Sequence, residues 1–128
     1  VCSGMHLLVA EDNTLNYEVV SELLSMNKIA CSHACNGAEC VEMFKSSAPG
    51  TYSGILMDIQ MPVMDGIEAA YAIRNQDHPD ATSIPIIAIT ANAFAKDIER
   101  CKLAGMNEHL SKPLNIRQLI SILSKFQR

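Results

Sequence analysis

The sequence lacks the features that would assign it to several specialised classes of protein. It has no run of Lys and Arg and a formal net charge of -4, which argues against a nucleic-acid-binding face. No apolar stretch approaches the length of a membrane span, and no signal peptide, repeat or low-complexity linker is recognisable. What remains is an ordinary globular composition, 48% hydrophobic and 19% charged, in a chain of 128 residues that predicts one domain.

Cysteine and histidine are present, but without the spacing of a disulfide framework or a zinc site. The five cysteines are an odd number and form no CxxC pair, which predicts reduced thiols packed as small hydrophobic side chains. The four histidines have no zinc-like spacing. The chain begins at Val1 instead of a methionine, which is compatible with a piece cut from a longer protein.

Five short apolar segments, bounded by polar or turn residues, are typical of β-strands. They cover His6–Ala10, Ile29–Ala34, Gly54–Asp58, Ile84–Thr90 and Glu108–Ser111. Polar residues interrupt the second segment, so we expect it towards an edge of the sheet. The fourth is almost wholly apolar, which favours cover on both of its faces.

Apolar residues at helical spacing follow each of these strands. The first predicted helix, capped by Asn13 or Thr14, has an apolar stripe made of Leu15, Val19, Leu23 and Met26, widened by Val20 and Leu24. The later stripes are Ala38, Val41 and Phe44; Ile67, Ala70 and Ile73; Phe94, Ile98 and Cys101; and Ile116, Leu119, Ile120 and Leu123. The alternation predicts an α/β fold, a parallel sheet with helices on both faces, over residues 1–128 with a core of about 5–126.

Four of the five strands end in a reactive or charged residue. Glu11-Asp12 follow the first, Asp58 ends the third, Thr90 ends the fourth, and the fifth leads to Lys112. Parallel strands present their C-terminal ends to one edge, so these groups should converge there. Clustered carboxylates repel unless a cation lies among them, and hard oxygen ligands with room for a phosphate suit Mg²⁺. Asp58 could then attack a phosphoryl group, with Lys112 and Mg²⁺ sharing the charge.

Taken in order, these residues resemble the receiver domain of two-component response regulators, from about Met5 to the C-terminal helix. The matching segments are Glu11-Asp12, Met57 to Pro62, Asp65-Gly66, Thr90-Ala91, and Gly105 through Lys112-Pro113. The resemblance implies a flavodoxin-like, doubly wound, five-stranded parallel sheet of order 2-1-3-4-5 with five helices. The amino-acid sequence of the last two segments is most similar to that of receivers attached to hybrid sensor histidine kinases.

The resemblance also implies a set of roles for single residues. Asp58 would accept phosphate from a phosphohistidine on a sensor histidine kinase or a histidine phosphotransfer domain. Asp12, Asp58 and the backbone carbonyl of Gln60 would bind Mg²⁺, and Glu11 would hold a metal-bound water. The residues that contact the phosphoryl group would be Thr90, Ala91 and Lys112, and the bond before Pro113 would be cis.

The same resemblance implies a conformational switch and residues that influence how long the phosphoryl group stays bound. Thr90 and His109 would couple the site to the face built by the fourth helix, fifth strand and fifth helix. His109 stands where the family usually has Tyr or Phe, and a half-exposed strand residue without a role is the alternative. Gln60 and Asn92 would flank the hydrolytic water, which carboxamides can orient but cannot deprotonate.

Two other functions are left open. A Mg²⁺-dependent phosphohydrolase of the haloacid-dehalogenase type would need a second carboxylate where Gln60 stands, together with a cap domain. A phosphorylation-independent docking module is disfavoured by the intact set of Asp12, Asp58, Thr90 and Lys112. The preferred prediction is a non-enzymatic phosphoacceptor in the cytoplasm, whether or not a parent protein is membrane-anchored. It makes no nucleic-acid or membrane contact of its own, and a homodimer is left open.

Overall fold

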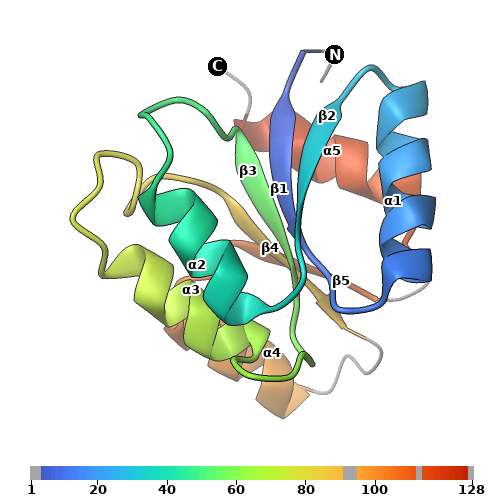
Figure 1. The fold of residues 1–128 in the computed structure, drawn as a ribbon. Coiled ribbons are helices and arrows are strands. Elements are labelled where there is room, and N and C mark those ends of the chain that lie inside the picture. The colour runs from blue at the N-terminus through green and yellow to red at the C-terminus, as the bar shows by residue number, and fades with distance from the viewer. Residues whose placement is uncertain (1–3, 91–94, 112–113, 127–128) are drawn as a thin grey trace.

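The computed structural model describes residues 4–90, 95–111 and 114–126, in which strands and helices alternate (Figure 1). The strands are β1 (His6–Ala10), β2 (Ala30–Ala34), β3 (Gly54–Asp58), β4 (Ile86–Thr90) and β5 (Glu108–Ser111). The helices are α1 (Thr14–Met26), α2 (Gly37–Lys45), α3 (Gly66–Arg74), α4 (Ala95–Leu103) and α5 (Ile116–Phe126). Every predicted element is present, although β2 and β4 begin one and two residues later than expected.

The strands form one parallel sheet in the order β2-β1-β3-β4-β5, which confirms the order implied by the family resemblance. The chain adds β2 on one side of β1 and then crosses to β3 on the other side. Ligands of such sheets bind outside the carboxyl ends of the strands, at the point where the order reverses. The topology therefore predicts a ligand site at the C-terminal ends of β1 and β3.

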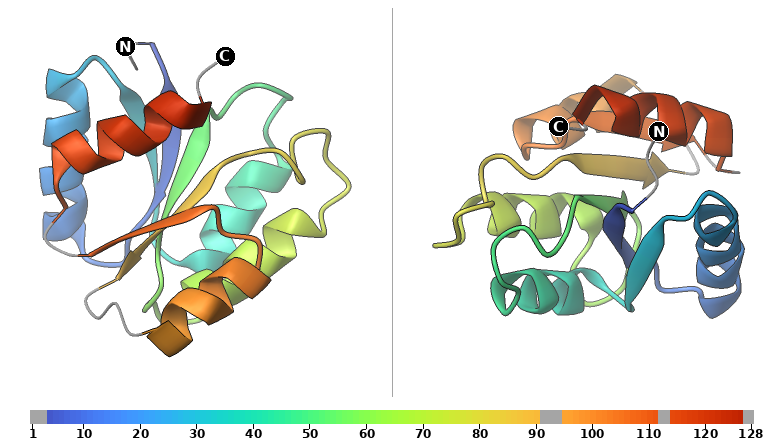
Figure 2. Two further views of the ribbon diagram at one scale, coloured as in Figure 1. Left: turned by 180° about the vertical axis from the view of Figure 1, so that it is seen from behind. Right: turned by 90° about the horizontal axis from the view of Figure 1, so that it is seen from above.

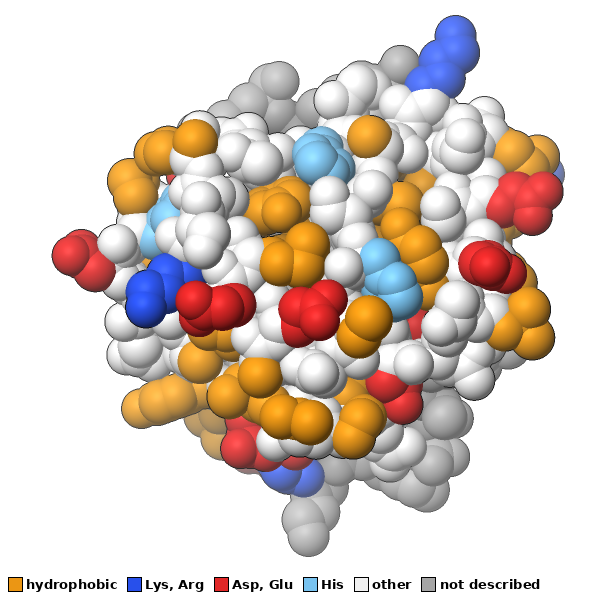
Figure 3. Space-filling view, in the orientation of Figure 1, with side chains coloured by type: hydrophobic (Ala, Val, Ile, Leu, Met, Phe, Trp, Pro, Cys, Tyr) orange, Lys and Arg blue, Asp and Glu red, His pale blue; other side chains and the backbone are white. Residues whose placement is uncertain are grey.

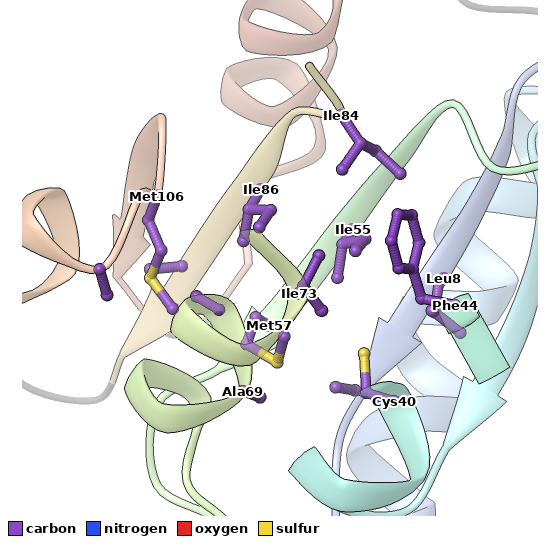
Figure 4. Close-up of a cluster of buried hydrophobic side chains, with 14 of the residues drawn as sticks. Leu8, Cys40, Phe44, Ile55, Met57, Ala69, Ile73, Ile84, Ile86 and Met106 are labelled. Carbon is purple, nitrogen blue, oxygen red and sulfur yellow. The ribbon is translucent and has the colours of Figure 1, made fainter. Parts of the chain in front are cut away.

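Each face of the sheet has its own buried cluster, because alternate residues of a strand point to opposite sides. Leu8, Ile55 and Met57 pack beneath α2, α3 and α4 (Figure 4). Leu7 and Leu56 instead pack with side chains of α1 and α5 on the opposite face. Figure 2 shows the sheet enclosed between these two groups of helices.

The apolar stripe predicted for α1 is largely wrong. Leu15, Val19 and Met26 are 69%, 53% and 75% exposed, whereas Val20 and Leu24 are the buried residues of this helix. The helix lies against the edge strand β2 and contributes to the cluster shared with α5, so only a narrow line of its surface is covered. Three apolar residues of the predicted stripe, Leu15, Val19 and Met26, are therefore exposed to solvent.

Arg74, at the C-terminal end of α3, binds the turn between α4 and β5. Its Nε and Nη2 donate to the carbonyl of Gly105 at 3.0 and 2.8 Å, and Nη1 donates to the carbonyl of Ala81 at 3.0 Å. Nη2 also donates to Asn107 Oδ1 at 2.8 Å. Gly105, with φ of 96°, ends α4 as predicted. The guanidinium thus ties this end of α4 to α3.

The thiols agree with the prediction in part: Cys40 and Cys101 are buried, whereas Cys31 is half-buried and Cys35 is exposed. Cys31, Cys35 and Cys40 are free thiols, Cys101 is buried, and Cys2 lies outside the described residues. Burial, followed by the nearby charge of Glu39, raises the pKa of Cys40 to about 12, so this thiol packs as a neutral group. Among the helices within the described ranges, none is long and apolar enough to cross a bilayer.

Candidate functional site

Three carboxylates predicted from the ends of β1 and β3 meet at one edge of the sheet. One oxygen from each of Glu11, Asp12 and Asp58 lies within 4.8 Å of the others. Glu11 is 5% and Asp58 4% exposed, while Asp12 is open to solvent. The predicted convergence of these residues is confirmed by this geometry.

Thr90 extends the same edge by one strand. The register pairs Asp58 with Ile89, so Thr90, the last residue of β4, lies just beyond Asp58 along the edge. Thr90 is buried and, together with Asp12 and Gln60, lines an open cleft of about 510 Å³. On the next strand Ser111 pairs with Thr90. The structure thus brings Thr90 to the cleft beside the acidic residues.

Several predicted site residues fall outside the described part of the chain. They are Ala91, Asn92, Lys112 and Pro113, together with the helix residue Phe94. Their roles stay predictions. His109, in contrast, is half-buried on β5 and pairs in register with Ala88, and its switching role is likewise a prediction.

The loop after β3 is held by backbone contacts. The N–H of Gln60 donates to Asp58 Oδ1 at 3.1 Å, and the N–H of Gly66 donates to the carbonyl of Ile59 at 2.8 Å. A side chain on Gly66 would collide with the carbonyl of Asp58, and one on Gly37 with the carbonyl of Met64. The two glycines that begin α3 and α2 therefore allow close approach of this loop.

Val63, in the middle of that loop, has a strained backbone. Its φ is 70°, a left-handed conformation that a β-branched residue rarely adopts, and its side chain is 84% exposed. Such strain persists only where surrounding contacts impose it, and it concentrates at functional sites. An apolar side chain is thus presented to solvent beside the cleft, whose lining includes the preceding Met61 and Pro62.

The acidic loop after β1 is held by hydrogen bonds to β2 and to side chains of the loop itself. The N–H of Glu11 donates to the carbonyl of Ala34 on β2 at 3.0 Å, and the N–H of Asn13 donates to Glu11 Oε2 at 3.2 Å. Asn13 Oδ1 accepts from the N–H of Asn16 at 3.0 Å and so caps α1, as predicted. The residue pair Glu11-Asp12 is thereby confined between a strand end and a helix cap.

Two charged residues that line the cleft, Asp65 and Arg100, were not among the predicted site residues. Asp65 caps α3 by accepting the N–H of Glu68 at 2.8 Å, and it also lines the cleft. Arg100 lines the cleft from α4. Asp65 belongs to the motif that carried the family resemblance, which was a usable signal. Nothing in the spacing of Arg100 indicates that α4 packs with this residue towards the cleft.

The acidic cluster fits a hard divalent cation. Three carboxylates so close together repel one another unless a positive charge lies among them. Oxygen ligands from few residues, with an open side for water and phosphate, are what Mg²⁺ prefers. Within the described residues this is the one cluster of three or more potential ligands, and it contains no histidine or cysteine.

The sequence model of one protein family, the response regulator receiver domain, matches residues 7–124 of this chain. The chain belongs to this family. A receiver domain is the part of a two-component or phosphorelay system that receives the signal, and the predicted fold and family are thereby confirmed.

Relatives of this receiver domain include histidine kinases. The peroxide stress-activated histidine kinase mak1 of Schizosaccharomyces pombe is 40% identical over 123 residues, which cover 95% of this chain and 8% of mak1. The receiver domain of the sensor histidine kinase PA1611 from Pseudomonas aeruginosa, crystallised with a magnesium ion in its active-site cleft, is 35% identical with a TM-score of 0.85. That match covers 97% of this chain and 98% of the solved one.

A third relative was solved together with its partner. The receiver domain of Saccharomyces cerevisiae Ssk1, in complex with the histidine phosphotransfer protein Ypd1, is 31% identical with a TM-score of 0.81. The match covers 95% of this chain and 88% of that one.

Proposed function

We propose that this receiver domain, with a core of about residues 5–126, takes a phosphoryl group onto Asp58 and acts as a phosphoacceptor, not as an independent enzyme. The observation that carries the proposal is the buried Asp58 carboxylate at the cleft, with Glu11 and Asp12 oxygens within 4.8 Å. Burying a carboxylate among like charges costs free energy, so such a residue is expected where a site uses its charge. The site needs no general base, because an ionised carboxylate is already nucleophilic.

In the proposed step an Asp58 oxygen attacks the phosphorus of a phosphohistidine. The bond between phosphorus and the imidazole nitrogen breaks, and its electron pair stays on that nitrogen. The N–H of Gln60 holds Oδ1 of Asp58, and the Thr90 hydroxyl can donate to a phosphoryl oxygen. A bound Mg²⁺ would offset the charge of the carboxylates and of the incoming phosphoryl group.

The remaining assignments rest on the family resemblance. Asp12, Asp58 and the Gln60 carbonyl would hold the ion, with Glu11 acting through water. The phosphoryl oxygens would also contact Ala91 and Lys112, and Gln60 and Asn92 would flank the hydrolytic water. Phosphorylation adds about two negative charges, which would bias a switch through Thr90 and His109.

Chemical trapping of the phosphorylated residue tests this proposal. The wild-type chain is incubated with acetyl phosphate and Mg²⁺, and a parallel sample contains EDTA. We expect a mass increase of one phosphoryl group that requires Mg²⁺ and is lost in base. Borohydride reduces an acyl phosphate to an alcohol, so peptide mapping should then find homoserine at position 58. A stable phosphate on Ser, Thr or His would contradict the proposal.

We further infer that the phosphodonor is a histidine phosphotransfer domain that docks on α1. The exposed Leu15, Val19 and Met26 lie on one face of this helix, which begins two residues after Asp12. A donor histidine can reach Asp58 only if its domain covers this edge of the sheet. Figure 3 shows apolar side chains at the surface on the side where α1 lies. The Ssk1 receiver was solved with such a phosphotransfer protein, which supports this choice of partner.

A surface substitution separates docking from chemistry. We expect the double change Leu15→Gln and Val19→Gln to slow phosphotransfer from phosphorylated Ypd1 about tenfold, which is the effect of removing roughly 1.4 kcal/mol of contact. Labelling by acetyl phosphate should be unchanged, because neither side chain reaches the cleft lining. The control is Leu103→Gln on α4, an equally solvent-open leucine at 80% exposure.

Transfer rates decide between the outcomes. If the α1 variant and the control both accept phosphate from Ypd1 at the wild-type rate, the docking surface is wrong and the phosphoacceptor proposal stands. Failure of the wild-type chain to accept phosphate from Ypd1, although acetyl phosphate labels it, would contradict the choice of partner. If the molar mass of the wild-type chain, measured by light scattering, rises with concentration, the apolar face would instead be assigned to contact with a second copy.

A further inference from the structure

An aromatic pair beside the acidic loop has no place in the site described so far. The rings of Tyr17 on α1 and His33 on β2 stack with centroids 3.8 Å apart and planes at 6°. His33 pairs in register with Val9, whose side chain belongs to the cluster under α1 and α5. Side chains in register on neighbouring parallel strands point to the same face, so the register places the His33 ring beneath α1.

The imidazole of His33 contacts the metal-binding loop directly. Its Nε2 lies 2.8 Å from the backbone carbonyl oxygen of Glu11. A carbonyl oxygen can only accept, so the proton of this hydrogen bond sits on Nε2. Because the N–H of Glu11 donates to Ala34, both backbone groups of Glu11 are held by β2.

Tyr17 in turn makes hydrogen bonds through its backbone N–H and its hydroxyl. Its N–H donates to the carbonyl of Asn13 at 3.0 Å, and its hydroxyl lies 3.3 Å from Cys31 Sγ. The thiol of Cys31 donates to Ser21 Oγ at 3.5 Å. Desolvation by burial and the hydrogen bond with Cys31 raise the pKa of Tyr17, so the hydroxyl stays protonated at neutral pH. The Tyr17 ring is therefore held at its hydroxyl by Cys31 and at its face by the His33 imidazole.

We propose that His33, held by Tyr17, is a positioning residue that fixes the Glu11-Asp12 loop for binding a divalent cation. The proposal rests on the metal site of the proposed function. Outer-shell partners that orient metal-binding groups contribute about ten- to a hundredfold to metal affinity. His33 touches a backbone carbonyl and not a carboxylate, so we expect an effect at the lower end of that range.

The test compares two histidines on neighbouring strands. His33→Phe retains a flat ring that can stack on Tyr17 but removes the donor to Glu11. His6→Phe is the matched control, because His6 Nε2 lies 2.8 Å from Ser32 Oγ and its ring meets Tyr52 edge-on at 5.2 Å. His6 begins β1, at the end of the strand away from the acidic edge.

Magnesium dissociation constants are measured by isothermal titration calorimetry on the full chain, and stability is measured by urea unfolding in EDTA. We expect His33→Phe to weaken Mg²⁺ binding about tenfold and His6→Phe to change it less than twofold. His33→Gln should recover most of the loss, because its amide N–H can reach the same carbonyl. Wild-type affinity in His33→Phe, or an equal loss in His6→Phe, would overturn the proposal.

A second variant covers the case in which His33→Phe does not fold. Tyr17→Leu removes the stacking ring and leaves the imidazole, and we expect a loss of about threefold in Mg²⁺ affinity; unchanged affinity would overturn the role of the pair. Failure of the wild-type chain to bind Mg²⁺ would overturn the metal site itself. If the wild type binds Mg²⁺ and both variants bind it with the same affinity, only the positioning role would be overturned.

Discussion

Asp58→Asn should abolish labelling by acetyl phosphate and Mg²⁺. The carboxamide has nearly the same shape as the carboxylate, but its oxygen is a poor nucleophile and cannot form an acyl phosphate. The substitution also removes one of three charges whose oxygens lie within 4.8 Å. In EDTA the variant should therefore be at least as stable as the wild type, measured by urea unfolding. Intact-mass spectrometry should show no phosphorylated species.

Asp65→Asn is the matched control for that result. Asp65 lines the same cleft, and its side chain caps α3 by accepting the N–H of Glu68. Asn caps helices as well as Asp does, so this change removes a charge of the same kind without disturbing the helix. We expect wild-type extents of labelling. Phosphorylation that persists in Asp58→Asn would show that the acceptor is not Asp58. Its loss in Asp65→Asn would show that the effect is not specific to the charge at position 58.

Gly66→Ala should lower the free energy of unfolding by about 3 kcal/mol, the upper part of the range for overpacking. The added methyl group would collide with the carbonyl oxygen of Asp58, the Cα of Ile59 and the side chain of Met57. Backbone atoms cannot rotate away, so the loop must shift and carry Asp58 with it. Slower labelling by acetyl phosphate should accompany the lost stability, and urea unfolding provides the measurement.

Gly54→Ala, at the start of β3, is the control for Gly66→Ala. The methyl group added there would lie 3.4 Å from both the Leu7 side chain and the Pro85 carbonyl, close to ordinary contact. We expect this variant to lose less than about 1 kcal/mol and to be labelled like the wild type. Equal stability of the two variants would mean that the loop after β3 accommodates a side chain at position 66.

Much of the site followed from where the strands end. Asp58 and Thr90 each close a short apolar run, and a parallel sheet necessarily brings such ends to one edge. That inference requires only the positions of the strands, which the apolar runs mark well. The order of the strands could not be derived from those runs, and it came from the family resemblance.

The contacts that the sequence did not predict depend on packing between distant elements. Periodicity shows that α1 has an apolar face, but not that a sheet edge covers only the line of Val20 and Leu24. Arg100 lines the cleft from α4, a placement that depends on tertiary packing and not on a local pattern. His33 meets Glu11 because of the register between β1 and β2, which no local pattern encodes.

The hydrogen bonds of Arg74 have a consequence for motion in this domain. They secure the turn after α4 to the end of α3, at the C-terminal ends of both helices. If phosphorylation moves α4, the helix must pivot about this fixed turn, and its displacement must grow towards the first residues of the helix. A probe at the start of α4 would then report the phosphorylated state, whereas one near Gly105 would stay silent.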